Sequence, residues 1–272
     1  MIDLHLHTTA SDGRLAPADL VNRVAAAHIT VMSVTDHDTV AGLADVRAAA
    51  TAAGVELIDG IEITAVHEGR DVHMLGYFID TADMALDRFL QTQRLRRVER
   101  VHEIGARLAS LGVAIDVPAL LAVAGRRLGA SVGRPVIARA LIESGHVSSM
   151  REAFDRYLAA GQAAFVPRQG PTPGEVVQVI HHARGLASMA HPGVTKQPGV
   201  MLRLVDEGLD AIEVYHSDHT AELQRELITF AGRSGLLMTG GSDYHGDDDR
   251  DRHLGRSTLP VGEFHRLLAA RA

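Results

Sequence analysis

The sequence predicts an α/β protein built as a distorted (β/α)7 barrel with a mainly helical insertion. Short apolar, β-branched segments alternate with Ala/Leu-rich amphipathic segments, which is the pattern of βα units around a parallel sheet. Seven such strands can be counted, which suggests a relative of the eight-stranded barrel. The alternation stops between about residues 86 and 165, where heptad-like apolar spacing and many arginines indicate helices.

The predicted elements follow one another in a regular order. We expect strands at Ile2–Leu6, Val31–Thr35, Val55–Asp59, Val72–Phe78, Leu186–Ala190, Ala211–Val214 and Leu236–Thr239. We expect helices at Pro17–Ala27, Val40–Ala53, Pro173–Ala183, Val200–Glu207 and Ala221–Ser234. Prolines at two helix starts and glycines after three helix ends support these boundaries. One further strand is expected at Ala163–Val166.

This order divides the chain into three parts. Residues 1–85 would form the first part of the barrel, residues 86–165 the helical insertion, and residues 166–272 the second part of the barrel. Since the insertion follows the fourth strand, we expect it to cover the active-site edge as a substrate-capping subdomain.

Length, charge and residue usage narrow the function classes. The 272 residues can bury a large core, and the absence of cysteine excludes disulfides and thiolate metal ligands. No apolar run approaches the roughly 20 residues of a membrane helix, so we expect a cytoplasmic protein without a membrane partner. A net charge of −7 argues against duplex DNA as a partner. The acidic run Asp247–Asp249 is expected to be a solvated loop, whereas Arg126 and Arg127 are among many arginines in the insertion.

Histidines and acids gather where the predicted strands end. His5 and His7 close the first strand, and Asp12 follows in the next loop. The other strands carry, in order, Asp36, His37 and Asp38 in TDHDT, Glu62 in DGIEIT, His73 in DVHMLGY, His191 in MAHPG, Glu213 and His216 in IEVYHS, and Asp243 and His245 in GSDYH. In parallel α/β barrels the carboxyl ends of the strands form the edge where chemistry is built, so these side chains should converge.

Each of these groups alone has an ordinary structural explanation. Asp38 could cap a helix, His73 could be a core histidine, and Glu213 could be a charge near the barrel rim. Together, however, they place many desolvated charges in one region, at a prohibitive cost unless cations neutralise them. Nitrogen and oxygen ligands without sulfur suit Mn²⁺, Zn²⁺ or Fe²⁺. Nine candidate ligands are too many for one ion, and they suit three.

The motifs HLHTTASDG, TDHDT, GIEIT, AHPG and GSDYH occur in this order. This ordered set resembles the PHP family (polymerase and histidinol phosphatase), within the amidohydrolase superfamily, and the resemblance covers the whole chain. It implies a distorted (β/α)7 barrel of the PHP type with a trinuclear metal centre. We expect three divalent ions per chain, with Mn²⁺ as the first choice and Zn²⁺ or Fe²⁺ as alternatives.

The resemblance also implies a ligand set for each ion. The sets are His5, His7, Glu62 and Asp243 for the first ion, Glu62 as a bridge with His73 and His191 for the second, and Asp12, His37 and His245 for the third. Some members of the family have histidine where this chain has Asp12, which leaves the metal preference of the third site open. Asp3 is expected to steady a histidine tautomer, and His216 to face the substrate.

A narrower resemblance concerns the substrate. GRPVIARAL at 133–141, FDRYL in the insertion and EVYHSDH look like one bacterial branch of the family. That branch removes the 3′-phosphate from 3′,5′-nucleotide bisphosphates such as pAp, and it has a related 5′-to-3′ exoribonuclease activity on short RNA. The resemblance therefore implies a small nucleotide substrate, with short single-stranded RNA as a further one. Val136 stands where the branch has a histidine, so that histidine's contacts are not transferred.

The expected chemistry is hydrolysis of a phosphate ester. Clustered ions lower the pKa of bound water, so a metal-bound hydroxide is the expected nucleophile. The leaving ribose oxygen would take a proton from His216 or from a metal-bound water, and the sequence leaves both open. Arg134 would bind a second phosphate bidentately, unless it serves only as a helix-entry residue beside Pro135. Further candidates for substrate contact are Lys196, Ser217 and His219.

Two alternatives have distinct signatures. A histidinol-phosphate phosphatase, or another small phosphomonoesterase, would bind only one phosphate, whereas the arginine-rich insertion favours a nucleotide with two. A non-catalytic metal-stabilised module, as in PHP domains attached to polymerases, predicts missing ligands. Here all nine positions carry side chains that can bind a metal.

Overall fold

The computed structural model describes residues 1–124, 129–195, 197–246 and 253–271. Seven strands form one sheet in sequence order: β1 (Ile2–Leu6), β2 (Val31–Val34), β3 (Glu56–His67), β4 (Arg70–Tyr77), β5 (Leu186–Met189), β6 (Ala211–His216) and β7 (Leu237–Gly241). The predicted acidic loop at Asp247–Asp249, as well as Arg126 and Arg127, lies outside the described residues.

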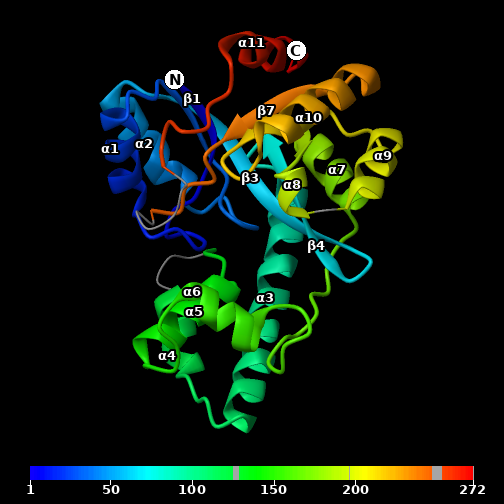
Figure 1. Cartoon of the computed structure of the whole chain (residues 1–272). Coiled ribbons are helices and arrows are strands. Elements are labelled where there is room, and N and C mark those ends of the chain that lie inside the picture. The colour runs from blue at the N-terminus through cyan, green and yellow to red at the C-terminus, as the bar shows by residue number, and fades with distance from the viewer. Residues whose placement is uncertain (125–128, 196, 247–252, 272) are drawn as a thin grey trace.

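The sheet curls until its two edge strands nearly meet (Figure 1). Strands β1, β2 and β3 are parallel, and so are β5, β6 and β7. At the seam, Leu6 pairs with Tyr244, and the backbone N–H of His7 donates to the carbonyl of Tyr244 at 3.0 Å. The predicted distorted (β/α)7 barrel is therefore confirmed.

The fourth strand differs from the prediction. We expected separate parallel strands at Val55–Asp59 and Val72–Phe78, but β3 continues far beyond the first range and β4 runs antiparallel to both β3 and β5. Glu68 and Gly69 form a two-residue hairpin turn with φ values of 48° and 75°, a combination that suits tight antiparallel connections. Glu62, expected just after the third strand, lies inside β3, and His73 lies inside the fourth strand, as expected, but this strand runs antiparallel.

Helices cover the outside of the barrel. They are α1 (Pro17–Ala26), α2 (Leu43–Ala53), α7 (Pro173–His182), α8 (Pro192–Thr195), α9 (Pro198–Asp206), α10 (Ala221–Ser234) and α11 (Val261–Ala270). All five predicted helices are present, and α8 and α11 were not predicted. Phe264 and Leu267 of α11 pack with Ile2 and Val31 and so cover the end of the barrel where β1 and β2 begin. No helix in the described ranges is both long and apolar enough to cross a membrane.

The segment between β4 and α7 is helical, as predicted. It contains α3 (Met84–Ser110), α4 (Val117–Ala124), α5 (Arg134–Glu143), α6 (Met150–Ala153) and the π-helical turn η1 (Phe154–Leu158). Its buried apolar side chains between Val101 and Val166 form a core of their own. In Figure 1 this green segment lies below the barrel, and α3 extends from the barrel into it.

The strand expected at Ala163–Val166 is wrong. This part of the chain is a turn followed by irregular backbone. Its carbonyls accept hydrogen bonds from α3 instead of from a neighbouring strand: Arg100 Nε donates to Val166 O at 2.9 Å, and Arg107 donates to Phe165 O. Arginine side chains therefore supply the hydrogen bonds to these backbone carbonyls that a neighbouring strand would supply in a sheet.

Strand β7 passes very close to β1 at Gly241. A Cβ at this position would lie 2.4 Å from the backbone nitrogen of His5 and 2.5 Å from its Cβ. Both are parts of a fully buried strand that cannot move independently, so only glycine fits.

Gly241→Ala is expected to lower the free energy of unfolding by about 1–3 kcal/mol, because a methyl group is forced into packed backbone. The matched control is Gly232→Ala in α10, where a Cβ would meet no atom within 4 Å. This control should be neutral or stabilise by up to about 1 kcal/mol, since alanine is the better helix former. Urea denaturation measures both changes, and equal midpoints for the two variants would contradict the assigned packing.

Candidate metal centre

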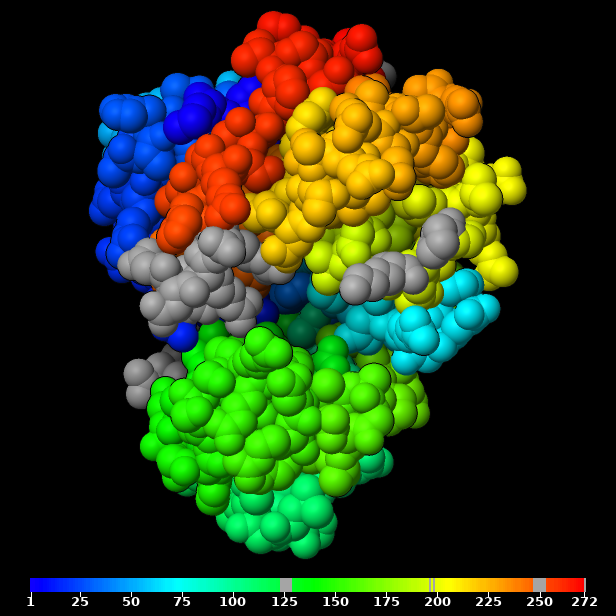
Figure 2. Space-filling model, in the orientation of Figure 1, coloured from blue at the N-terminus to red at the C-terminus, as the bar shows by residue number. Residues whose placement is uncertain are grey.

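The nine predicted ligands converge on one region at the barrel face next to the helical segment, where Figure 2 shows a hollow between the two parts. Their potential ligand atoms fall into overlapping groups, within each of which all atoms lie within 4.8 Å of one another. The groups are His7, Asp12, His37 and His245; His5, His191 and Asp243; His5, His7 and Glu62; and His37, Glu62 and His73.

Glu62 occupies the middle of this cluster, and its side chain is 1% exposed. Oε2 lies 3.2 Å from Nε2 of His5, 3.2 Å from Nε2 of His7 and 3.3 Å from Nδ1 of His37. Oε1 lies 2.7 Å from Nδ1 of His73 and 3.2 Å from Nε2 of His191. Burial raises the pKa of Glu62, but the surrounding imidazoles outweigh it and hold the pKa well below its usual range. Glu62 is thus an anion placed between two halves of the cluster, as a bridging ligand would be.

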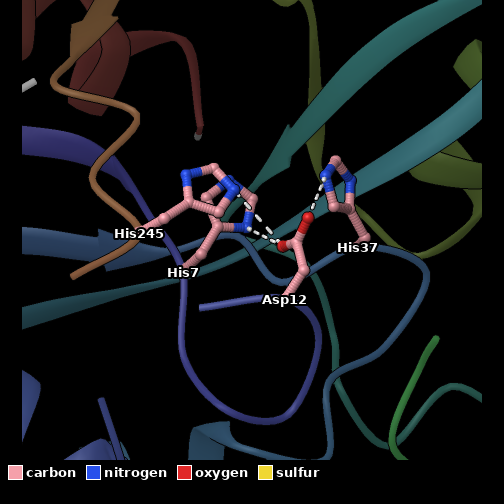
Figure 3. Close-up of side chains that lie close together, drawn as sticks. All are labelled: His7, Asp12, His37 and His245. Carbon is pink, nitrogen blue, oxygen red and sulfur yellow. Dashed lines mark ion pairs between the residues drawn. The ribbon is translucent and has the colours of Figure 1, made fainter. Parts of the chain in front are cut away.

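Asp12 organises a second part of the cluster, drawn in Figure 3. Its Oδ1 lies 3.3 Å from Nε2 of His245 and 3.9 Å from Nδ1 of His7, and its Oδ2 lies 3.7 Å from Nε2 of His37. The rings of His7 and His245 are stacked with centroids 4.2 Å apart. Interactions with the imidazoles lower the pKa of Asp12 well below its usual value, although burial opposes this.

Asp243 joins these parts from the end of β7. Its Oδ1 lies 3.2 Å from Nε2 of His7 and 3.5 Å from both Nε2 of His5 and Nδ1 of His245. Asp243 and His191 have positive φ values of 54° and 27°. Such backbone conformations are costly for residues other than glycine, and they cluster where a structure holds a functional group in place.

The donor atoms fit divalent metal ions. Both ring nitrogens of His7, and Nδ1 of His37, His73 and His191, are buried without a hydrogen-bond partner among the described residues. Burial alone would lower the pKa of His7. The carboxylates of Asp243 and Glu62 raise it by a larger amount, so the pKa of His7 is about 10. The cluster therefore attracts positive charge strongly, and nitrogen and oxygen donors at this spacing suit Mn²⁺, Zn²⁺ or Fe²⁺.

Glu213 is a supporting residue whose role the sequence analysis missed. It is fully buried on β6; its Oε1 lies 2.9 Å from Nδ1 of His5, and its Oε2 accepts the backbone N–H of His191 at 2.8 Å. Burial raises its pKa, yet His5 and its neighbours lower it to about 2. A carboxylate on the far nitrogen of a candidate ligand fixes its tautomer and orientation. The IEVYHS motif supplied the position but could not show which way the side chain points.

This finding corrects the expected role of Asp3. Asp3 does not hold an imidazole: its Oδ1 accepts the backbone N–H groups of Ser242 at 2.9 Å and of His5 at 3.3 Å. It therefore fixes the backbone at the β1–β7 seam. Burial raises its pKa to about 6, although the backbone hydrogen bonds oppose this.

Asp36 and Asp38 differ in what they hold. Asp36 accepts the backbone N–H and the hydroxyl of Thr8 at 2.8 and 2.6 Å and the hydroxyl of Ser11 at 2.6 Å, so it shapes the loop that carries Asp12. Asp38 does not cap α2, which begins only at residue 43. It faces the helical segment instead.

The predicted substrate-contacting residues are spread unevenly around the cluster. His216 is 1% exposed; its Nδ1 accepts the backbone N–H of Asp218, and its Nε2 lies 3.4 Å from Oδ2 of Asp243. Ser217 donates its hydroxyl to the carbonyl of Ser242 at 3.1 Å. Lys196 lies outside the described residues, and Nη2 of Arg134, the first residue of α5, lies 3.1 Å from Oδ2 of Asp71 on β4.

His219 has both ring nitrogens engaged within the protein. Its Nδ1 lies 2.9 Å from the carbonyl of Val214 and therefore carries the proton, and its Nε2 accepts the backbone N–H of Gly193 at 3.2 Å. With 7% exposure, His219 holds the segment after His191 in place.

The comparisons with known proteins agree with this geometry. The PHP domain family matches residues 3–104. The 5′-3′ exoribonuclease Rnm of Escherichia coli K12 is 37% identical over 251 residues, which cover 89% of this chain and 84% of the relative. A 3′,5′-nucleoside bisphosphate phosphatase of Chromobacterium violaceum is 33% identical over 270 residues, which cover 94% of this chain and 91% of the relative. The chain belongs to the PHP family.

A solved structure is similar to this protein over almost the whole chain. An amidohydrolase from Chromobacterium violaceum, determined with bound sulfate and no metal, superposes with a TM-score of 0.89 at 32% identity and covers 99% of this chain and 96% of its own. A metal-dependent phosphoesterase from Bifidobacterium adolescentis superposes with a TM-score of 0.90 at 30% identity and covers 100% of this chain and 96% of its own. Together, the relatives of this PHP protein indicate a metal-dependent phosphoesterase.

Removal of divalent ions with a chelator is expected to lower the melting temperature, because a ligand that binds only the folded state stabilises it. Calorimetry before and after addition of excess Mn²⁺ measures the shift and its reversal. Identical melting curves with and without the ions would contradict a metal centre built into the fold.

His7→Asn and Asp243→Asn are each expected to lose bound metal and to lower phosphoesterase activity at least about 100-fold, the upper end of what loss of a supporting residue costs. The control is His182→Asn, which removes an imidazole whose side chain is 67% exposed. Elemental analysis and activity are measured on the same preparations. Near-normal metal content and activity in either ligand variant would refute the assignment.

Proposed function

We propose that this protein is a metal-dependent phosphatase that removes the 3′-phosphate from 3′,5′-nucleotide bisphosphates such as pAp, giving AMP and phosphate. The observation that carries this proposal is a layer of buried and partly buried arginines directly beside the metal-ligand cluster. Such a layer suits a substrate that carries a second anionic group.

The nine side chains of the cluster would hold three divalent ions, and Mn²⁺ suits their nitrogen and oxygen atoms. The ions would supply an activated water at neutral pH and neutralise charge on the phosphoryl group. The bond between phosphorus and the ribose 3′-oxygen breaks, a bond to the water oxygen forms, and the ribose oxygen takes up a proton.

The arginine layer consists of Arg97, Arg100, Arg134 and Arg168, and it surrounds the carboxylates of Asp38 and Asp71. Four guanidinium groups face two carboxylates, so the layer retains positive charge after its internal pairing. Asp38 follows His37 directly, and Asp71 lies on β4 two residues before His73. The arginine layer therefore lies directly next to the metal-ligand cluster.

Arg134 is the member of this layer best placed for a substrate. Its Nη2 lies 3.1 Å from Oδ2 of Asp71, its guanidinium lies over the rings of Phe154 and Phe165 at 5.7 and 5.8 Å, and its side chain is 22% exposed. Aromatic rings hold the guanidinium plane in a fixed orientation, which suits bidentate binding of a phosphate. Arg134 would bind the 5′-phosphate while the metal centre holds the 3′-phosphate.

His216 is proposed to orient Asp243 and to act as the general acid that protonates the leaving ribose oxygen. Because its Nδ1 accepts the N–H of Asp218, the proton of a neutral ring resides on Nε2, the atom facing Asp243.

The same site would trim short RNA from the 5′ end, since the 3′-phosphate of the first nucleotide is then a diester. The exoribonuclease among the relatives supports this second activity.

Phosphate release from pAp is expected to exceed release from AMP and from histidinol phosphate by at least about tenfold in kcat/KM, because only pAp engages both the metal centre and the arginine layer. Malachite green detection with Mn²⁺-loaded protein measures all three. Faster turnover of AMP or histidinol phosphate would refute the substrate assignment and favour a general phosphomonoesterase.

Arg134→Gln is expected to raise KM for pAp about tenfold or more, since a charge-assisted hydrogen bond contributes roughly 1.5–3 kcal/mol. Hydrolysis of p-nitrophenyl phosphate, which has no second phosphate, should change little. The control is Arg151→Gln on α6, where the arginine side chain is 91% exposed. Equal losses for both substrates would assign Arg134 a purely structural role.

A further inference from the structure

A basic surface along α3 shares Arg97, Arg100 and Arg168 with the arginine layer and extends beyond it to Arg96 and Arg107. A hollow of about 190 Å³ runs between α3 and the segment Val166–Gln169, and we call it the α3 groove. Its lining includes five arginines: Arg96, Arg97, Arg100, Arg107 and Arg168. Glu99 and Glu103 also line it, so cations outnumber anions on the groove surface in a protein whose net charge is −7.

Helical spacing and two anchoring contacts shape this groove. Arg96, Arg100 and Arg107 recur at intervals that place them along one side of α3. Arg100 and Arg107 donate to the carbonyls of Val166 and Phe165, and so hold the returning segment alongside the helix. Arg96 has an exposed side chain without an ion-pair partner in the described part of the chain. From Arg96 to Arg107 the helix rises about 16 Å, so the basic surface is longer than one phosphate group.

The inner wall of the groove is also the outer wall of the catalytic site. Arg168 Nη1 lies 3.7 Å from Oδ2 of Asp38, and its Nε lies 3.5 Å from Oδ1 of Asp71. Its side chain is only 10% exposed, and Nε has no hydrogen-bond partner among the described residues. Burial, together with the nearby Arg97, lowers the pKa of Arg168 to about 9. An anion in the groove would stabilise this under-compensated charge.

A second hollow continues the groove beyond Arg96. It has a volume of about 570 Å³ and a mixed lining, with Phe89 and Pro171 as apolar walls and Glu175 as one carboxylate; the other lining residues are Thr92, Gln93, Arg96, Gly170, Gln178 and Val179. The ring of Phe89 is partly exposed there. A row of guanidinium groups leading to an aromatic ring is the combination that binds single-stranded nucleic acid through its phosphates and one stacked base.

We propose that the α3 groove is an exosite for the backbone of single-stranded RNA, which holds the downstream part of an RNA whose first nucleotide lies between Arg134 and the metal centre. This inference rests on the proposed function, because it concerns the longer of the two substrates. The groove would contact phosphates, so binding would not depend on base sequence. Single nucleotides such as pAp would not reach Arg96 and Arg107, the arginines of the groove that lie outside the arginine layer.

The test compares substrates of different length on Mn²⁺-loaded protein. For Arg96→Gln/Arg107→Gln, KM and kcat for pAp and for a 5′-phosphorylated dinucleotide should stay within about twofold of the parent. KM for a 5′-phosphorylated octaribonucleotide should rise on the order of tenfold, and the salt dependence of its binding should flatten by about 0.7 in slope per lost phosphate contact. Glu103→Gln should change the octanucleotide KM in the opposite direction, because it removes a competing carboxylate from the groove.

Two controls keep the outcomes separate. Arg96→Gln alone leaves the contact of Arg107 with Phe165 intact, and Arg151→Gln removes an exposed arginine elsewhere in the same helical segment. Binding of a fluorescent octaribonucleotide is also followed by anisotropy in the Asp243→Asn background, which reports on the groove even if RNA is not hydrolysed. Failure to hydrolyse pAp would refute the proposed function and leave this binding test standing.

An unchanged octanucleotide KM and salt slope in the double variant would overturn the exosite. An equal loss for pAp and the octanucleotide would also overturn it, because the arginines would then support the fold around the metal centre. Competition by inorganic phosphate without any binding of RNA would identify a small-anion site instead.

Discussion

The structure depends on the concentration of buried charge around Glu62. One carboxylate lies within 3.3 Å of five imidazole nitrogens, in a region where Glu62, His5 and His7 are buried and, of these imidazoles, only His37 and His73 keep more than a tenth of their side chains exposed. Uncompensated ions in such a place cost several kcal/mol each. The barrel can hold them because most of its strands direct their polar side chains to one point and because bound cations would neutralise the carboxylates.

Fixing so many side chains at one point demands rigid surroundings, and buried carboxylates outside the ligand set provide them. Glu213 aligns His5 and the backbone of His191, Asp36 ties down the loop of Asp12, and Asp3 joins β7 to β1. Each accepts two or more hydrogen bonds, so each can stay charged or partly charged in the interior. The positions of the metal ligands therefore depend on the closure of the barrel, since Asp3 and the contact of Gly241 with His5 both lie at the seam between β1 and β7.

The sequence predicted the barrel, the helical insertion and the convergence of nine side chains, because strand periodicity and the order of the motifs are local properties of the chain. It did not predict that β4 runs antiparallel, since an apolar run has no direction and the turn at Glu68 and Gly69 is only two residues long. It also assigned Asp3 the role of steadying an imidazole, which Glu213 has, and it assigned Glu213 no role in the site. Asp3 lies two residues before His5 and Glu213 lies far along the chain on β6, and only the three-dimensional structure decides which carboxylate reaches the imidazole and which reaches a backbone amide.

The arginines explain why the helical insertion is joined so firmly to the barrel. Arg97 contacts Asp38, donates to the hydroxyl of Thr64 at 2.9 Å and to the carbonyl of Val132 at 3.2 Å, and so connects β3, the loop after β2 and the approach to α5. Burying such a charge is favourable only when its partners are buried with it. The insertion therefore cannot move away without exposing Asp38 beside His37, so these contacts fix the position of Arg134 relative to the metal-ligand cluster. If Arg134 binds a second phosphate, as proposed, a rigid distance between the two anion sites would select substrates by the spacing of their phosphates, and the barrel chemistry would be confined to nucleotides with a phosphate at each end of the ribose.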